Sequence, residues 1–137
     1  MIKLKNLLSE SAVDYKGKTI DDLIELGIFF RSKQEFTQQF GIDGLHEYDE
    51  LIPQTDAYKK LKNSMTDKPL VGSEKQVKWA EKIREKAASK VARKLVKAIH
   101  MTKIGFGDVD YNELGRIEMG KFNNNSAAYY IDNRFSF

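Results

Sequence analysis

Residues 72–101 read GSEKQVKWAEKIREKAASKVARKLVKAIHM, the longest periodic stretch of the chain. Ser73 and Gln76 stand in the S-x-x-Q spacing of a capping box, which predicts that a helix begins here. Apolar residues then recur every three or four positions to about Met101, the period of an amphipathic helix. An unbroken helix of this length would measure roughly 40 Å at about 1.5 Å per residue, so it sets the scale of the fold.

A helical wheel separates this stretch into two faces. One arc carries apolar residues: Val77, Ala80, Ala87, Val91, Leu95, Ala98 and Ile99. The opposite arc, called here the cationic face, carries seven basic residues: Lys75, Lys78, Lys82, Lys86, Lys90, Arg93 and Lys97. Trp79 falls among the lysines and Arg84 falls within the apolar arc, so these two residues require a tertiary explanation.

Charge is distributed very unevenly along the chain, whose formal net charge is +3. Residues 74–103 carry 10 basic and 3 acidic side chains, a net of +7, whereas the segments on either side are each at −2. Such a concentrated positive field favours a polyanionic partner. Three interpretations of the cationic face stay open: a solvated surface, a phosphate-binding surface on which Trp79 stacks a base, or a surface for an acidic protein.

The remaining sequence predicts shorter helices and a mainly all-α fold. Capping residues and glycine stops mark the expected helices, which cover residues 20–26, 33–40, 56–65, 111–119 and 127–134. Residues 41–54 are acidic and turn-rich, and Pro53 marks a break. A minor β-ribbon is expected near residues 103–122, at 103–109 or 116–122.

Length and composition bound the class of protein. The 137 residues suffice for one helical domain with a modest core, which we place over residues 11–137. The absence of cysteine excludes disulfides, thiolate metal ligands and a cysteine nucleophile. No apolar run approaches the roughly 18 residues of a membrane span, and no secretory signal is recognisable. We expect a protein without membrane contact, in the cytoplasm of a bacterium or in a virus that infects one.

No residue pattern of a conventional active site is present. His46 precedes acidic residues, but one histidine lacks the spacing of a known metal site, and a solvated acidic loop is expected. His100 is expected as a cation at the end of the long helix, where the helix dipole favours positive charge. Gly105 and Gly107 form only a lone G-x-G, and nothing orients a Ser-His-Asp triad. We therefore predict a non-enzymatic protein with no cofactor and no metal.

Three short segments resemble a pattern found in small, uncharacterised phage and plasmid proteins. They are GSEKQ at residues 72–76, WAEKIR at 79–84 and AYYIDNR at 128–134. The family pattern is GS-x-KQ-x-x-WAE-x-IR followed later by A-x-W-W-I-D-x-R, and tyrosines here replace the two tryptophans. The resemblance implies no activity, but it suggests that the C-terminal helix packs across the long helix.

Such packing would explain both misplaced residues. The residues that we expect to pair are Trp79, Ile83 and Arg84 on the long helix with Tyr130, Ile131 and Asp132 on the C-terminal one. The apolar and aromatic side chains would cover one another, and Asp132 would meet Arg84, because a buried arginine needs a partner. This arrangement predicts that Trp79 is part of the core.

The first ten residues, MIKLKNLLSE, are similar to the capsid-targeting peptides of T-even-like phage internal head proteins. Those peptides are amphipathic, begin at Met1 and are removed by the prohead protease after Leu/Ile-x-Glu. The matching residues here are Leu8 and Glu10, which implies a removable helix over residues 1–10 and cleavage before Ser11.

These observations lead to one main hypothesis and two alternatives. The main hypothesis is a phage accessory protein, packaged or made early, that binds a host factor or nucleic acid through its basic helix. The first alternative is a structural head or assembly protein that contacts packaged DNA. The second is a small regulatory nucleic-acid-binding protein. The expected partners are nucleic acid or an acidic host protein, and the expected location is the virion interior, the host cytoplasm, or both.

Overall fold

The structure is a computed structural model that describes residue 25 and residues 30–137. Within these residues the chain is mainly helical and contains no strand. The helices in chain order are α3 (Lys33–Phe40), α4 (Leu45–Leu51), the short 3-10 helix η1 (Ile52–Gln54), α5 (Asp56–Thr66), α6 (Glu74–Lys103), α7 (Tyr111–Gly120) and α8 (Ala127–Asp132). The all-α prediction is confirmed.

Helix α6 begins at the predicted capping box. The Ser73 hydroxyl accepts a hydrogen bond from the Gln76 amide at 3.2 Å, and the Gln76 side chain accepts one from the Ser73 amide at 3.1 Å. This reciprocal pair satisfies two backbone amides at the start of the helix. The helix continues unbroken to Lys103, and Gly105 adopts a left-handed φ of 94° just beyond it. The predicted long helix is confirmed and extends slightly further than expected.

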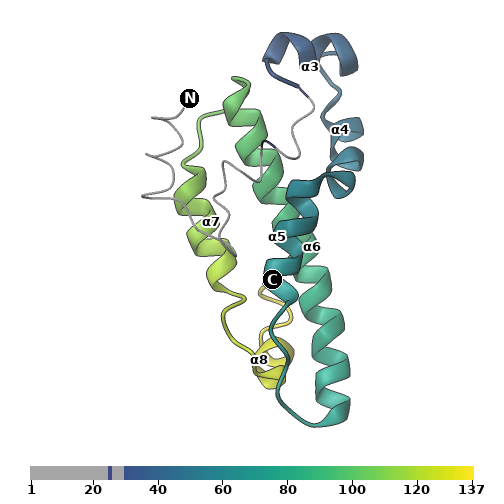
Figure 1. Ribbon diagram of the computed structural model, residues 1–137, viewed down its shortest axis with the longest axis vertical. Coiled ribbons are helices and arrows are strands. Elements are labelled where there is room, and N and C mark those ends of the chain that lie inside the picture. Colours follow the sequence, from purple (N-terminus) through teal and green to yellow (C-terminus); the bar gives the residue numbers. More distant parts are fainter. Residues whose placement is uncertain (1–24, 26–29) are drawn as a thin grey trace.

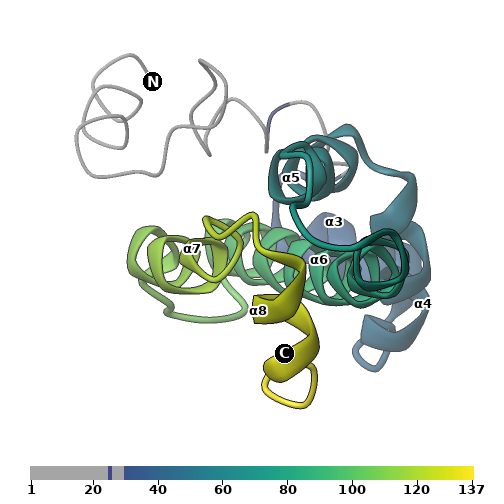
Figure 2. The same ribbon diagram turned by 90° about the horizontal axis from the view of Figure 1, so that it is seen from below.

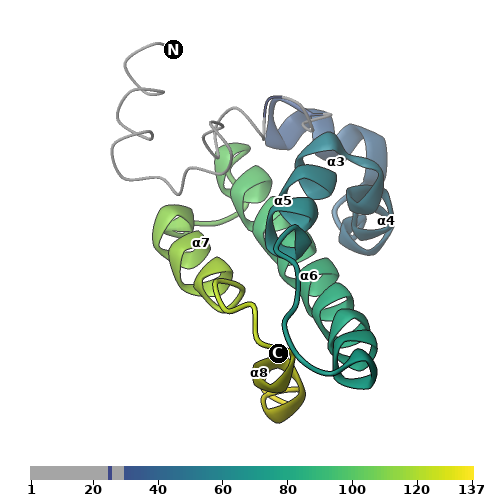
Figure 3. The same cartoon turned by 60° about the horizontal axis from the view of Figure 1, so that its bottom comes forward.

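Three other helices pack along α6 (Figure 1). Helix α5 lies beside α6 and runs in the opposite direction, α7 lies on another side, and α8 contacts the half of α6 nearest its beginning. Seen from below, α5 and α8 lie on opposite sides of α6 (Figure 2). A third view shows α3 and α4 at the end of α6 opposite α8 (Figure 3). The other helices therefore pack around α6 as a central element.

A continuous core runs along the buried side of α6. Five residues of the predicted apolar arc are buried, namely Ala80, Ala87, Val91, Leu95 and Ile99. Val77 and Ala98 are half-buried. Facing side chains include Leu61 of α5 and Tyr130 of α8, both almost fully buried. The apolar periodicity of the sequence thus predicts the buried side of α6 correctly, because each neighbour covers part of one helical stripe.

An aromatic cluster closes the C-terminal end of α6. The fully buried Phe36 ring lies 5.2–5.7 Å, centroid to centroid, from the rings of Phe30, Phe40, Tyr48 and Phe106. Most of these pairs meet edge to face, an arrangement that aromatic rings prefer. The cluster joins α3 and α4 to the turn that follows α6.

Helix α4 occupies a segment for which the sequence predicted turns. Residues 45–51 are helical, and Tyr48 is turned inward to the aromatic cluster with 1% of its surface exposed. Burial of this ring stabilises the short helix although two glycines, Gly41 and Gly44, precede it. The prediction of a solvated loop here was wrong, because local composition does not reveal a tertiary contact.

The β-ribbon predicted near residues 103–122 is absent from the described chain. Residues 111–120 form α7, and the Asp110 carboxylate caps its first turn by accepting a hydrogen bond from the Glu113 amide at 3.1 Å. The described residues contain one isolated parallel bridge, between Val71 and Ser126. The ribbon prediction was wrong, and the helix prediction for the same segment was right.

The predictions for the beginning of the chain lie outside the described residues. They are the removable helix over residues 1–10, the cleavage site at Leu8, Glu10 and Ser11, and, apart from Glu25, the helix over residues 20–26.

Candidate functional site

The cationic face of α6 is largely exposed. Six of its side chains are exposed, Lys75, Lys78, Lys82, Lys86, Lys90 and Arg93, and Lys97 is half-buried. The helical period places these side chains along one side of α6. From Lys86 to Lys97 the face extends about 16 Å at about 1.5 Å per residue. It is a linear array of cations on a rigid element.

The acidic residues of α6 lie along a different edge of the helix. Glu74, Glu81 and Glu85 recur at helical spacing, away from the middle of the cationic face. Glu85 pairs with Lys62 of α5 at 2.7 Å, and this hydrogen bond raises the pKa of Lys62. Glu74 lies 3.5 Å from Lys78 near the beginning of the cationic face. None of the three α6 carboxylates pairs with Lys86, Lys90 or Arg93, so the centre of the cationic face keeps its positive field.

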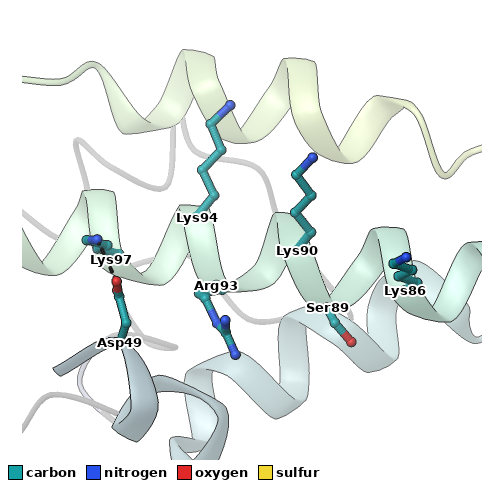
Figure 4. A pocket seen from close by; sticks show the side chains of 7 residues that line it. All are labelled: Asp49, Lys86, Ser89, Lys90, Arg93, Lys94 and Lys97. Atoms are coloured by element: carbon teal, nitrogen blue, oxygen red, sulfur yellow. Dashed lines mark hydrogen bonds and ion pairs between the residues drawn. The ribbon is translucent and has the colours of Figure 1, made fainter. Parts of the chain in front are cut away.

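A groove of about 460 Å³ lies on the cationic face (Figure 4). It is called here the cationic groove, and its lining residues are Asp49, Lys86, Ser89, Lys90, Arg93, Lys94 and Lys97. Figure 4 shows Lys90 and Lys94 projecting to one side of α6 and Ser89 and Arg93 to the other. Five cations thus surround one surface depression, and one carboxylate opposes them.

Some of the groove cations are held by carboxylates of neighbouring helices. Lys97 pairs with Asp49 of α4 at 3.0 Å. Lys94 pairs with Glu118 of α7 at 3.1 Å, and Glu118 also accepts from Lys121 at 3.2 Å. Burial opposes ionisation of Glu118, yet the two lysine hydrogen bonds hold its pKa below the ordinary value. These pairs fix the sides of the groove.

Other groove cations are available to a ligand. Lys86 and Arg93 are exposed and make no hydrogen bond or ion pair with any residue that the structure describes. Among the residues that the structure describes, Lys90 makes only a long contact, 3.5 Å from Nζ to the Phe137 backbone oxygen. Lysine and arginine side chains in this state can bind phosphate oxygens without first breaking an internal pair.

Trp79 lies on the exposed side of α6, so the prediction that it belongs to the core was wrong. Its exposed fraction is 49%, and the Arg134 guanidinium lies over its ring, 5.3 Å from the centroid. Trp79 therefore occupies the position among the lysines that the helical wheel gave it. Ile83 and Ile131 are half-buried against the core, and Tyr130 is fully buried.

Arg84 is buried, with 7% of its surface exposed, as its place in the apolar arc predicted. Its Nη1 donates a hydrogen bond to the Lys68 carbonyl at 2.6 Å, and its guanidinium lies 5.9 Å from the centroid of the Tyr130 ring. Asp132 is exposed at the end of α8. The predicted Asp132–Arg84 pair was therefore wrong, whereas the predicted packing of α8 across α6 is confirmed.

His100 is buried in the aromatic cluster, with 1% of its surface exposed. Its Nε2 lies 3.0 Å from the Phe30 carbonyl, which can only accept, so Nε2 carries the proton and donates. The other ring nitrogen, Nδ1, then accepts from the Tyr48 hydroxyl. Burial lowers the pKa of His100, and the Phe30 bond partly offsets that effect. The expectation of a cation at this helix end was wrong, because the imidazole is buried.

Within residue 25 and residues 30–137, no group of three or more histidine, cysteine or acidic residues could hold a metal ion. His46 is exposed and lies 3.6 Å from Glu50, one helical turn away on α4. No helix of this part of the chain combines the length and the apolar character of a membrane span.

Sequence reasoning missed three residues around the cationic face. Lys94 lines the groove but lies at the edge of the wheel's basic arc. Arg134 and Phe135 follow α8, and their positions beside α6 depend on how the chain turns after that helix. The signal available in the sequence was the concentration of aromatic residues in RFSF at residues 134–137.

Comparison of the chain with protein-family models, with curated proteins and with solved structures found no match.

Proposed function

We propose that the protein binds nucleic acid through the cationic face of α6, in a role of binding without catalysis. One observation carries this proposal: Lys86 and Arg93 are exposed and without a described partner in a groove that Lys90, Lys94 and Lys97 also line. A ligand for such a groove must supply several negative charges in a row. A phosphodiester backbone does so, because each strand of a duplex carries one charge per about 3.4 Å of the duplex axis.

The dimensions of the face agree with such a ligand. The approximately 16 Å from Lys86 to Lys97 is long enough to contact several successive phosphates of one strand. Contacts of this kind give affinity without choice of base sequence, since every phosphate is alike. We therefore propose sequence-independent binding with a strong dependence on salt.

Neither of the two histidines lines the cationic groove. Both ring nitrogens of His100 are engaged inside the aromatic cluster. His46 lies on α4 beside Glu50, and it does not line the cationic groove. Neither histidine lies next to the unpartnered cations. The proposal therefore gives no described residue a role in proton transfer at the groove.

The biological setting is a separate proposal that rests on the resemblance at residues 1–10. We propose a phage accessory protein that is packaged with the genome and delivered to the host, where a DNA-binding face would suit either a takeover role or contact with packaged DNA. Mass spectrometry of purified virions tests it. A mature chain that starts at Ser11 is expected, and absence of the protein from particles would refute packaging.

Binding is tested with two double variants that remove the same charge. Lys86→Gln with Arg93→Gln removes the unpartnered groove cations, whereas Lys59→Gln with Lys60→Gln removes two exposed cations of α5 outside the groove. Fluorescence anisotropy with a labelled oligonucleotide at about 50 mM salt should show much weaker binding for the groove variant only. Equal loss in both variants would show that net charge, not the groove, attracts the ligand.

A wild-type protein that binds neither DNA nor RNA under these conditions would refute the proposal. Retention of an acidic protein through the same lysines would then reassign the cationic face to protein recognition, in which charge steers encounter and sets specificity.

A further inference from the structure

We infer that a second cavity, next to the cationic groove, binds an unpaired nucleobase, so that the protein prefers single-stranded nucleic acid. This inference rests on the proposed function and specifies its ligand. The cavity has a volume of about 430 Å³ and lies between α6 and the segment that follows α8. It is called here the aromatic cavity, and its lining residues are Ile83, Lys86, Ala87, Lys90, Arg134, Phe135 and Phe137.

The chemistry of the aromatic cavity fits a nucleotide. Ile83, Ala87 and Phe137 supply apolar surface, and Ile83 and Phe137 pack against the core behind them. Three cations share the lining, namely Lys86, Lys90 and Arg134. A nucleobase presents a flat apolar face, and its attached phosphate carries a negative charge. One nucleotide can therefore contact both the apolar and the cationic residues of the lining. The volume lies within the usual range of small-ligand sites, about 300–1,000 Å³.

The aromatic cavity adjoins the cationic groove. Lys86 and Lys90 line both. A strand whose phosphates lie in the groove would therefore pass the mouth of the cavity at these two lysines. A base that is not held in a duplex could turn into the cavity while its neighbours remain along α6.

Two exposed aromatic rings lie beside the cavity. Such exposure is unusual for a surface that contacts only solvent. Phe135 is 89% exposed and Trp79 is 49% exposed. The Arg134 guanidinium lies over both rings, 4.7 Å from the Phe135 centroid and 5.3 Å from the Trp79 centroid. Arg134 also donates to the Ile131 carbonyl at 2.6 Å, which anchors it to the end of α8. Such an arginine and aromatic surface offers flat faces on which bases can stack.

This arrangement distinguishes single strands from duplexes. In a duplex the flat faces of the bases are already stacked on one another, and a base must be flipped out before an aromatic side chain can reach it. A single strand presents its base faces at little cost. The cationic groove would bind both forms, whereas the aromatic cavity and the exposed rings would strengthen binding of the single strand alone.

Trp79 makes the inference directly measurable, because it is the only tryptophan of the chain. The full-length protein is titrated with an oligothymidylate of about 16 nucleotides, the upper end of common site sizes, and with a duplex that carries the same number of phosphates. Stacking near Trp79 should quench its fluorescence with the single strand and leave it nearly unchanged with the duplex. The single strand should also bind more tightly.

Phe135→Ala provides the second readout, since removal of so exposed a side chain leaves the core intact. It should weaken single-strand binding about tenfold and leave duplex binding unchanged. Ile117→Ala is the matched control, because Ile117 is also an exposed apolar residue but lies on α7 and lines neither cavity. Equal affinity for both ligands, with no quenching and no effect of Phe135→Ala, would overturn the inference and leave the proposed function standing. Failure of the wild-type protein to bind either ligand would refute both.

Discussion

The Tyr48 hydroxyl and the His100 imidazole share a buried hydrogen bond that joins α4 to the end of α6 across 52 positions of sequence. The second ring nitrogen of His100 bonds the Phe30 carbonyl at 3.0 Å, and the Phe30 ring stacks parallel to the imidazole at 6.2 Å between centroids. One neutral histidine therefore connects three segments, and its protonation would remove the acceptor that Tyr48 needs.

The first prediction concerns pH. Burial holds the pKa of His100 below its ordinary value of about 6.5, so the unfolded chain binds this proton more readily than the folded one. The stability that neutral His100 contributes is complete above about pH 6.5 and is lost as the pH falls from there through the lower folded-state pKa. Urea unfolding at a series of pH values should show the free energy of unfolding falling over this window.

Two variants isolate that effect from the titration of carboxylates. His100→Gln should flatten the pH dependence below about 6.5, even if it lowers stability at neutral pH. Tyr48→Phe should lower stability at neutral pH by about 1–3 kcal/mol, because it leaves Nδ1 of His100 buried without a donor. If His100→Gln keeps the wild-type pH profile, His100 is not the group that titrates.

A second prediction contrasts two aromatic residues that the sequence placed in one cluster. Tyr130 is fully buried under α6, so Tyr130→Ala should cost about 3–5 kcal/mol. Trp79 is half-exposed, so Trp79→Ala should cost only about 1 kcal/mol. Chemical denaturation of both variants checks this difference. Equal losses, together with a blue-shifted native fluorescence spectrum of Trp79, would indicate that Trp79 is buried after all.

A third prediction concerns the partner of the buried Arg84. Because Arg84 bonds the Lys68 carbonyl and not Asp132, Asp132→Asn should change the free energy of unfolding by less than about 0.5 kcal/mol. Arg84→Ala should cost about 2–5 kcal/mol because it removes buried packing, and Arg84→Met should recover much of it by refilling the volume without a charge. A large change in the free energy of unfolding on Asp132→Asn would instead support the Asp132–Arg84 ion pair that the sequence suggested.

A fourth prediction compares two helix caps. The Ser73 hydroxyl accepts from Gln76 at the start of α6, whereas the Ser126 side chain makes no capping bond at the start of α8. Ser73→Ala should therefore cost about 1 kcal/mol, and Ser126→Ala distinctly less. Similar losses in the two variants by thermal or urea unfolding would contradict the assigned role of the capping box.

The sequence predicted best where the determinants are local. The capping serine at position 73, the apolar stripe of α6 and the cap at Asp110 each depend on residues within a few positions. Predictions failed where a distant segment decides the outcome. His100 is buried because Phe30 and Tyr48 cover it, and Tyr48 lies in a segment whose glycines and acidic residues resemble a loop.

The candidate site also combines features that the local sequence predicts with features that depend on tertiary contacts. The helical period alone placed the cationic face and Trp79 on one side of α6, and only an added packing hypothesis moved Trp79 into the core. Lys86 and Arg93 were identified from the sequence, but their lack of described partners depends on where α4 and α7 place Asp49 and Glu118. The aromatic cavity depends on the turn after α8 that brings Phe135 to α6, which no periodicity predicts.

The salt dependence of binding tests the central claim, that the groove cations contact phosphates, most directly. The slope of log K against log salt concentration is measured for the wild-type protein and for the two charge-matched double variants. Lys86→Gln with Arg93→Gln should reduce the magnitude of the slope by about 0.7–0.9 for each phosphate that the variant no longer neutralises, and Lys59→Gln with Lys60→Gln should leave it unchanged. A wild-type slope near zero, or an equal reduction in both variants, would contradict the account.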